Sequence, residues 1–399
     1  MPRAAALRGG PGGRAGYGSA PVSVEPSQRP DVRRFLTSSE GWPYLLVLFI
    51  PVAIALDVAH VSPVLIFFTS ALGVIPTAAL MGRATEELAA RSGPGIGGLL
   101  NVTFGNAPEL IIALFALGAG LHEVVKASII GSVIGNVLLV LGASMFAGGL
   151  GRQRQRFSRT SAAAQSSMLL LAIVAMMMPA IFELVEGKGL PLPGAERVNY
   201  DATVEHLSLA VAFVLIASYG AGLLFSLKTH RDLFNPPSGD DDEHGESWSV
   251  RRSVGALALA GVAVGVMSEI LVSSISEAAK SIGLTEFFVG AIVVAIVGNA
   301  AEHWVAVLVA RKDKMDLAVN IAIGSSAQIA LFVAPVLVLT SFVLGPEPMP
   351  LVFNGFELGG VFLAVLIAIH VTNEGESTWF EGVQLLAVYA VLALAFAFA

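Results

Sequence analysis

The chain has 399 residues, of which 55% are apolar and only 13% are charged, and its formal net charge is −7. Soluble domains carry about 25% charged residues, so this composition excludes an ordinary soluble protein and favours one embedded in lipid. It contains no basic stripe with interleaved aromatic residues, so we expect no nucleic-acid partner. The absence of cysteine excludes disulfides, thiolate metal sites and cysteine nucleophiles.

The first 36 residues are rich in Gly, Pro and Arg and lack a continuous apolar run. This pattern does not match a cleaved secretory signal. We therefore predict a disordered cytoplasmic N-terminal tail at 1–36. A regulatory tail is the alternative interpretation.

Apolar runs of about 20 residues, long enough to cross a bilayer, follow one another along the rest of the chain. They lie near 43–59, 62–81, 96–119, 124–149, 161–182, 203–227, 253–276, 284–310, 315–343, 350–371 and 378–398. The sequence therefore predicts an all-α polytopic membrane protein with eleven transmembrane helices.

The distribution of lysine and arginine predicts the orientation of these helices. From Arg29 onward, sixteen of these residues fall in the tail and in the connections on its side of the membrane, including the cluster Arg152–Arg159. The connections on the opposite side hold four, namely Lys126, Lys188, Arg197 and Lys280. The positive-inside rule places the N-terminus in the cytoplasm and the C-terminus outside. Binding of anionic lipid is an alternative role for the arginine cluster.

A polar, acidic stretch near the middle of the chain separates two sets of five predicted helices. Because five is odd, the second set enters the membrane from the opposite face, as in the inverted repeats of secondary transporters. We therefore expect a peripheral first helix at 37–60, a five-helix repeat at 61–234, an acidic cytoplasmic loop at 235–248 and a second five-helix repeat at 249–399.

Repeated motifs support this division. The sequence GNAPE at Gly105–Glu109 returns 193 residues later as GNAAE at Gly298–Glu302. The same offset pairs Gly131-Ser132 with Gly324-Ser325 in the next predicted helix of each half. With a two-residue gap, Thr85-Glu86 also pairs with Ser276-Glu277.

Each half places one carboxyl group inside a predicted helix, Glu109 in the first and Glu302 in the second. A charge at the centre of a bilayer costs about 2.5–3.5 kcal/mol, so such residues usually have a function. Neutral carboxyls that serve only packing are the alternative, which their matched repeat positions disfavour.

Neutral oxygen donors are expected close to the two carboxyls. Asn106 and Asn299 each lie three residues before a glutamate, on the same helix face. The next helices supply Ser132 with Asn136, and Ser325 with Gln328. Gly105, Pro108 and Gly298 can loosen the helices so that backbone carbonyls contribute. Helix packing is an equally good explanation for Gly131, Gly135 and Gly324.

A site made only of oxygen atoms suits a hard cation such as Ca²⁺, which takes six to eight oxygens. Mn²⁺ fits as well, and we expect no bound cofactor, only Ca²⁺ and H⁺ as transported substrates. Two ionised carboxylates balance one Ca²⁺, and two protons neutralise the same pair when the metal leaves. Only the loaded states are then nearly neutral, which gives a physical basis for obligate exchange.

Three further features have two interpretations each. His303 could relay protons or tune Glu302, or it could serve packing. Glu269 is either a secondary cation or proton site or a solvated residue near a helix end. The acids between Asp240 and Glu246 either attract Ca²⁺ or are merely solvated.

These motifs resemble those of the Ca²⁺/H⁺ exchanger family, within the cation/Ca²⁺ exchanger superfamily. The resemblance rests on GNAPELIIAL (Gly105–Leu114), GNAAEHWVAV (Gly298–Val307), and the following segments Gly131–Gly142 and Gly324–Pro335. It implies one peripheral helix and two inverted five-helix repeats. It also implies cation ligands at Asn106, Glu109, Asn299 and Glu302, with Ser132, Asn136, Ser325 and Gln328 close by.

The resemblance leaves competing functions open. Na⁺/Ca²⁺ exchangers of the superfamily typically carry GTS-type motifs, whereas asparagine and glutamine occur here, which favours protons. A cation channel is a weaker alternative, because one acid per matched repeat suits alternating access. No enzyme motif occurs at membrane depth, so we expect a transporter. Short connections favour a prokaryotic plasma membrane, with a vacuolar membrane as the alternative, and leave the oligomeric state open.

Overall fold

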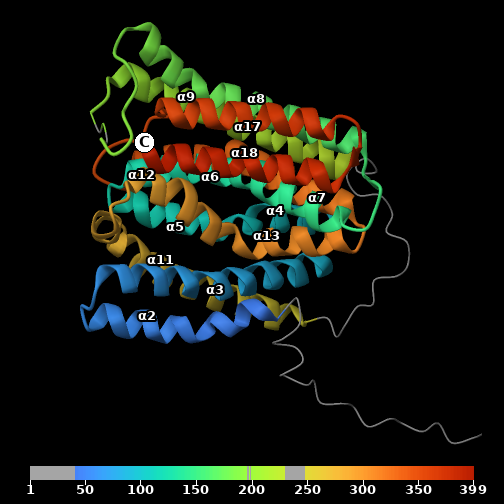
Figure 1. Ribbon diagram of the computed structural model, residues 1–399. Helices are drawn as coiled ribbons and strands as arrows, with labels where there is room; N and C mark the ends of the chain where they lie inside the picture. The colour runs from blue at the N-terminus through green and yellow to red at the C-terminus, as the bar shows by residue number, and fades with distance from the viewer. Residues whose placement is uncertain (1–40, 196, 198, 230–247) are drawn as a thin grey trace, which may run out of the picture.

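The computed structural model describes residues 41–195, 197, 199–229 and 248–399. The predicted tail at 1–36 lies outside these residues, as do positions 235–247 of the predicted acidic loop. The described chain is almost entirely helical, and its helices run roughly parallel as one bundle (Figure 1).

The first half contains a 3₁₀ helix, two π-helical segments, α-helices and one short strand. They are η1 (Trp42–Leu48), α2 (Phe49–Val58), α3 (Pro63–Arg91), α4 (Gly93–Gly105), α5 (Ala107–Gly118), α6 (His122–Ile134), η2 (Gly135–Val140), α7 (Leu141–Gly149), β1 (Gln155–Arg156), α8 (Arg159–Val185), α9 (Ala202–Leu224) and η3 (Phe225–Thr229).

The second half has the same character, with more π-helical segments. Its elements are α11 (Val250–Ile282), α12 (Glu286–Phe288), η4 (Val289–Val294), α13 (Ala295–Arg311), α14 (Met315–Val319), η5 (Asn320–Gly324), α15 (Ser325–Gln328), η6 (Ile329–Val333), α16 (Ala334–Ser341), α17 (Gly355–Thr372), β2 (Glu376–Ser377) and α18 (Trp379–Phe398).

Within the described residues, nine continuous helical segments are long and apolar enough to cross a bilayer. Two further apolar segments match predicted spans: the pair Leu99–Gly105 and Ala107–Gly118, bent by 44°, and the shorter helix Trp42–Val58. The prediction of an all-helical, multi-pass membrane protein is confirmed, while the count of eleven stays a prediction.

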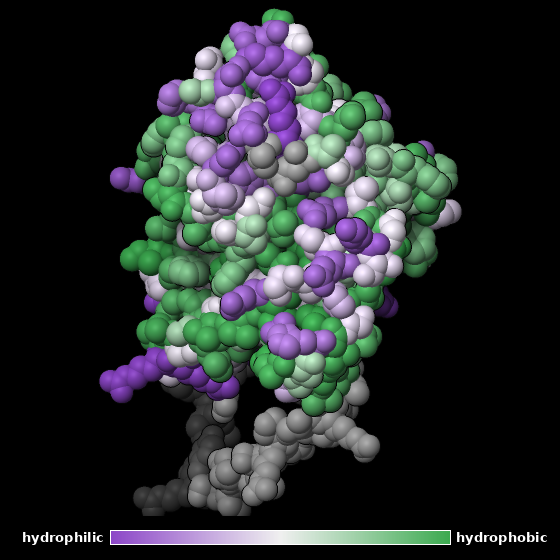
Figure 2. Space-filling view, turned by 90° about the vertical axis from the view of Figure 1, so that its left-hand side faces the viewer, coloured by the Kyte–Doolittle hydropathy of each residue, from purple (hydrophilic) through white to green (hydrophobic). Residues whose placement is uncertain are grey.

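The surface of the bundle agrees with a lipid environment. Leu171, Leu259 and Val391 are between 64% and 70% exposed, although each lies well inside a long apolar helix. Figure 2 looks onto the end of the bundle that lies at the left of Figure 1. Hydrophilic side chains gather over the centre and top of this end, and hydrophobic side chains line both flanks. Lipid contact along the flanks accounts for this distribution.

Two segments form the interior of the bundle. The span His122–Gly149 of the first half and the span Met315–Ser341 of the second half are its most buried helices. They follow directly after the two segments that carry Glu109 and Glu302. α3 and α11 pack along each other at one side of the bundle, and α8, α9 and α17 lie at the opposite side (Figure 1).

The two halves are also joined at one end of the bundle by a two-stranded sheet. β1 pairs antiparallel with β2, with Gln155 opposite Ser377. Arg154 and Arg156 both contact the Glu376 carboxylate, at 2.7 and 3.1 Å. The hydrogen bond from Arg154 is the main reason why the pKa of Glu376 lies below its usual range. Exposed ion pairs of this kind each contribute little to stability. The buried Gln155, which donates to the carbonyl of Ala310, therefore contributes more to the stability of this connection between the halves.

Close backbone packing explains one of the predicted helix glycines. A methyl group added at Gly131 would lie 2.0 Å from the carbonyl oxygen of Ala291, because α6 packs directly against η4. Gly135, one turn later, has no atom within 4 Å of the same position. Helix packing is therefore the reason for glycine at Gly131, and it does not apply at Gly135.

We predict that Gly131→Ala destabilises the protein strongly and that Gly135→Ala does not. Overpacking of a core costs about 1–3 kcal/mol, and a clash with backbone should reach at least the upper value. Thermal unfolding of the two purified variants in detergent measures the difference. Equal midpoints for both variants would contradict the packing explanation.

Candidate cation-binding site

The helix break between α4 and α5 positions the first acidic motif. α4 ends at Gly105 and α5 begins at Ala107, with Pro108 in its first turn. Proline has no backbone N–H, and it is tolerated at the start of a helix, where that donor would be unpaired anyway. Asn106 lies in the break and Glu109 in the first turn of α5.

The second motif is built differently, although its sequence is nearly the same. Gly298, Asn299 and Glu302 all lie inside the continuous helix α13. The expected loosening at Gly298 therefore does not take the form of a break. The irregular backbone comes earlier, in the π-helical segment η4.

The two motifs meet at the centre of the bundle, each glutamate against the first glycine of the other motif. A methyl group added at Gly298 would lie 3.2 Å from Cγ of Glu109. One added at Gly105 would lie 3.5 Å from Oε1 of Glu302. The two carboxyl groups are close enough for their charges to interact. Glycine at Gly298 therefore gives Glu109 room to approach the opposite half, whereas the contact at Gly105 is an ordinary van der Waals distance.

Hydrogen bonds connect the remaining predicted residues across the halves. Nδ2 of Asn106 donates to Oε1 of Gln328 at 2.6 Å, and Nδ2 of Asn299 donates to Oγ of Ser132 at 3.1 Å. Within the second half, the hydroxyl of Ser325 donates to Oε2 of Glu302 at 2.9 Å.

His303 contacts the eighth predicted residue. Its Nε2 lies 3.0 Å from Oδ1 of Asn136, the first residue after Gly135 in η2. The structure thus brings together all eight predicted site residues. Asn136 differs from the others because its oxygen is already engaged by His303, which leaves its Nδ2 buried without a protein partner.

Three buried oxygen atoms at this site accept no hydrogen bond from any described residue. They are Oδ1 of Asn106, Oε2 of Glu109 and Oδ1 of Asn299. Nδ2 of Asn299 also donates to the carbonyl of Ala295 at 2.9 Å, so its amide is oriented with the oxygen pointing away from that carbonyl. An unpaired buried acceptor costs about 1–3 kcal/mol, so these oxygens are arranged for a cation or a donor.

The oxygen donors at this site include both charged carboxylates and neutral amide and hydroxyl groups. Nowhere in the described chain do three or more His, Cys, Asp or Glu side chains gather as a metal centre. A cation held here would therefore use two carboxylates completed by amide and hydroxyl oxygens. Hard cations such as Ca²⁺ accept such ligands.

Of the residues with two interpretations, Glu269 is exposed on α11, and no hydrogen bond or ion pair of the described chain joins it to this site. Glu86 of α3, noticed in the sequence only through the repeat, is close enough for its charge to act on Glu302. Its repeat partner Glu277 lines a cavity of about 380 Å³ with Asp57 and Ser274.

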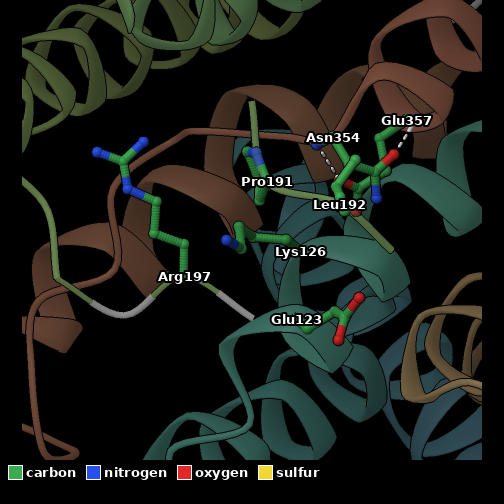
Figure 3. A pocket seen from close by; sticks show the side chains of 7 residues that line it. All are labelled: Glu123, Lys126, Pro191, Leu192, Arg197, Asn354 and Glu357. Carbon is green, nitrogen blue, oxygen red and sulfur yellow. Dashed lines mark hydrogen bonds between the residues drawn. The ribbon is translucent and has the colours of Figure 1, made fainter. Parts of the chain in front are cut away.

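Sequence reasoning missed a cluster of charged residues at the end of the bundle opposite the small sheet (Figure 3). Glu123, Lys126 and Glu357 are buried there, around a cavity of about 10 Å³, room for a single water molecule. Lys126 donates to the carbonyl of Val352, and Glu123 accepts from the backbone N–H of Gly194.

The same cluster includes a fully buried acid of α8. Glu183 pairs with Arg197 at 2.9 Å and with Lys188 at 3.7 Å. In the sequence, Lys126, Lys188 and Arg197 served only to predict the orientation of the helices in the membrane. The polar residues His122, Glu123 and Lys126 in the first turns of α6 were the available sign of a buried network, but no repeat marked them.

The sequence matches a known protein family over most of its length. The family model described as "Sodium/calcium exchanger protein" matches residues 62–228 and 252–398. The chain belongs to this family. The resemblance predicted from the two GNA motifs is confirmed, and the matched segments leave out the first helix and the acidic loop.

Relatives of this exchanger match it over nearly its whole length. The "Ca(2+)/H(+) antiporter" of Aphanothece halophytica is 45% identical over 88% of this chain and 95% of its own. The "Ca(2+)/H(+) antiporter ChaA" of Bacillus subtilis is 44% identical over 88% of this chain and 97% of its own. The solved structure of native YfkE has a TM-score of 0.76 and 40% identity, and covers 90% of this chain and 100% of that one.

Two neighbouring serines of the exchanger offer a test of the site. Ser325 donates to Glu302, whereas the buried Ser326 donates to the carbonyl of Ala322 in its own helix. We expect Ser325→Ala to weaken Ca²⁺ binding at least tenfold, because a hydrogen bond to a charged group contributes about 1.5–3 kcal/mol. Ser326→Ala should leave binding unchanged. Calorimetric titration of the purified variants measures both, and an equal loss in the two would remove Ser325 from the site.

Proposed function

We propose that the chain is a secondary antiporter that exchanges Ca²⁺ for H⁺ by alternating access. The observation that carries this proposal is the set of three buried, unpaired oxygens beside two acids from opposite halves. The names of the relatives support the choice of Ca²⁺ and H⁺ as the two substrates.

The ligand set would hold the cation between the halves. Glu109 and Glu302 would supply the charge, and Asn106 and Asn299 the amide oxygens that are now unpaired. Ser132, Asn136, Ser325 and Gln328 would complete or orient this shell. Gln328 now holds the amide of Asn106, and Ser132 that of Asn299.

Charge balance would couple the two fluxes. With both acids ionised, the empty site carries −2 in a region where each buried charge is costly. One Ca²⁺ or two protons neutralise it, and only these neutral forms can be enclosed cheaply as the halves move. The carrier would therefore cross between its two states loaded with one substrate or the other.

The proposed architecture is eleven membrane-spanning segments with two inverted repeats. It takes the nine long helical segments, the bent pair Leu99–Gly105 and Ala107–Gly118, and the helix Trp42–Val58 as spans. The N-terminus would be cytoplasmic, so the end with β1 and β2 would face the cytoplasm and the charged cluster would face outside. A prokaryotic plasma membrane is the proposed location.

We predict that Glu109→Gln and Glu302→Gln each abolish exchange without loss of expression. Glutamine keeps the size of the side chain but cannot ionise, so the site can no longer balance a divalent cation. Glu269→Gln is the matched control, because Glu269 is exposed and no hydrogen bond or ion pair of the described chain joins it to the site. Uptake of ⁴⁵Ca²⁺ into proteoliposomes measures all three, and wild-type exchange in either site variant would reject the assignment.

The coupling ion is tested in the same vesicles. We expect an imposed H⁺ gradient to drive Ca²⁺ uptake and an equal Na⁺ gradient to have no effect. Replacement of Ca²⁺ by Mn²⁺ measures cation selectivity. Uptake driven only by Na⁺ would make the chain a Na⁺/Ca²⁺ exchanger, and uptake with no counter-ion would make it a channel.

A further inference from the structure

A contact between two tryptophan rings joins the first helix (Trp42–Val58) to the helix that carries Glu302. Trp42 of η1 meets Trp304 of α13 edge to face, with ring centroids 5.5 Å apart and ring planes inclined by 70°. Such pairs are favourable beyond the apolar area that they bury. Trp304 follows Glu302 by two residues, about 200° around an α-helix, so the two side chains point to different sides of α13. The contact therefore depends on the position of α13 without involving a cation ligand.

Trp42 belongs to a group of helices that are fastened together at one end. η1 packs on α3, and α3 packs along α11, at the side of the bundle where α2 also lies (Figure 1). Arg83 of α3 donates a hydrogen bond to Tyr44 of η1 and lies over the ring of Trp248, 5.4 Å from its centroid. The backbone N–H of Trp248, just before α11, donates to Glu87 of α3 at 2.9 Å. We call the joined helices η1, α2, α3 and α11 the α3–α11 unit.

α13 is tied to a different part of the bundle. It packs against α7 and α14 as well as against α3. The buried Gln155 of β1 donates to the carbonyl of Ala310 in α13, which fastens this helix to the small sheet. β1 and β2 contain no residue of the α3–α11 unit. The contact of Trp42 with Trp304 therefore crosses the boundary between the α3–α11 unit and the centre of the bundle.

The contact between the rings is weak enough to open. Trp304 is 38% exposed, so the pair lies at the edge of the bundle and not in its core. Nε1 of Trp42 is buried and donates no hydrogen bond to any described residue. A buried indole N–H usually has a partner, and its absence offsets part of the gain from the ring contact. Separation of the two rings therefore costs little.

The contact has no equivalent in the repeat. Trp42 precedes the first predicted repeat, and with the offset of 193 residues Trp304 corresponds to Ile111. In an inverted repeat, the opposite access state arises when the halves exchange their conformations. That exchange cannot form a second tryptophan pair at the other face, because neither tryptophan has a counterpart. The contact therefore belongs to one of the two access states and favours it.

We propose that Trp42 and Trp304 form a latch, by which the first helix holds the α3–α11 unit against α13 in one access state, and that this latch opens in every transport cycle. The inference rests on the proposed alternating access. The latch raises the population of the state that it holds. The apparent affinity for Ca²⁺ at each face scales with the population of the state open to that face, so the latch also sets the ratio of the two affinities.

The first test asks whether the latch must open. The chain contains no cysteine, so an engineered cysteine pair can be cross-linked specifically. The double variant Trp42→Cys/Trp304→Cys is joined with a reducible bifunctional methanethiosulfonate, and mass spectrometry measures the extent of cross-linking. The control joins Arg156→Cys to Glu376→Cys, two positions that lie opposite each other in the small sheet. Proteoliposomes are assayed for Ca²⁺/Ca²⁺ exchange at equal pH and for uptake driven by an H⁺ gradient.

We expect the cross-link between the tryptophan positions to slow both modes at least tenfold, and its reduction to restore them. The cross-linked control should keep the rate of its reduced form. An unchanged rate in the fully cross-linked tryptophan pair, or an equal loss in the control, overturns the latch. Because Ca²⁺/Ca²⁺ exchange needs alternating access but no protons, a wild type that shows this mode without H⁺-driven uptake would overturn only the proposed coupling ion.

The second test measures the bias between the two states. We expect Trp42→Ala and Trp304→Ala each to change the ratio of the apparent KM values for Ca²⁺ at the two faces about three- to tenfold, as for the loss of an aromatic pair. The double variant should change it no further, because both substitutions remove the same contact. Trp42→Phe keeps a ring and should retain the wild-type ratio.

The control for these substitutions is Trp379→Ala. Trp379 contacts the ring of its neighbour Phe380 within α18, so its loss should leave the ratio unchanged. Inverted and right-side-out membrane vesicles give the apparent KM at the two faces. An unchanged ratio in both alanine variants, or an equal change in Trp379→Ala, overturns the latch. A lower maximal rate with an unchanged ratio would show a merely structural role and overturns it as well.

Discussion

The central constraint is the placement of two carboxyl groups, one from each half, inside a bundle of buried helices. Ionised acids at this depth are costly, so the surroundings must provide either a balancing charge or a proton. The amides beside them satisfy their own donors and keep Oδ1 of Asn106 and Oδ1 of Asn299 unpaired. This arrangement is poor for stability and useful for binding, because the missing partner can be a transported ion.

The rest of the bundle holds the two inner spans rigidly around this pair. Gly131 allows α6 to contact η4 through backbone atoms, and the small sheet joins the halves at one end. At the other end, the pairs of Glu183 with Arg197 and Lys188 tie the connection after α8 to the helix ends. Neither junction includes α3 or α11. Movement of these two helices against a fixed centre is therefore compatible with the contacts of the described chain.

Much of the site was predictable because the sequence repeats it. The matched positions of Glu109 and Glu302 identified the acids, and helix spacing identified Asn106 and Asn299. The sequence could not indicate that the first motif lies at a helix break while the second lies in a continuous helix. It also missed the buried cluster of Glu123, Lys126 and Glu357, because the repeat does not mark it and its members come from distant parts of the chain.

The two halves share a sequence pattern but differ in their contacts. Ser325 donates to Glu302, whereas its repeat partner Ser132 accepts from Asn299 and donates no hydrogen bond to Glu109 within the described chain. In an inverted repeat, the opposite state follows by exchanging the conformations of the halves. Ser132 would then donate to Glu109, and Ser325 would accept from Asn106. Each serine would move from one polar partner to another without becoming unpaired, so the exchange of states would cost few buried hydrogen bonds.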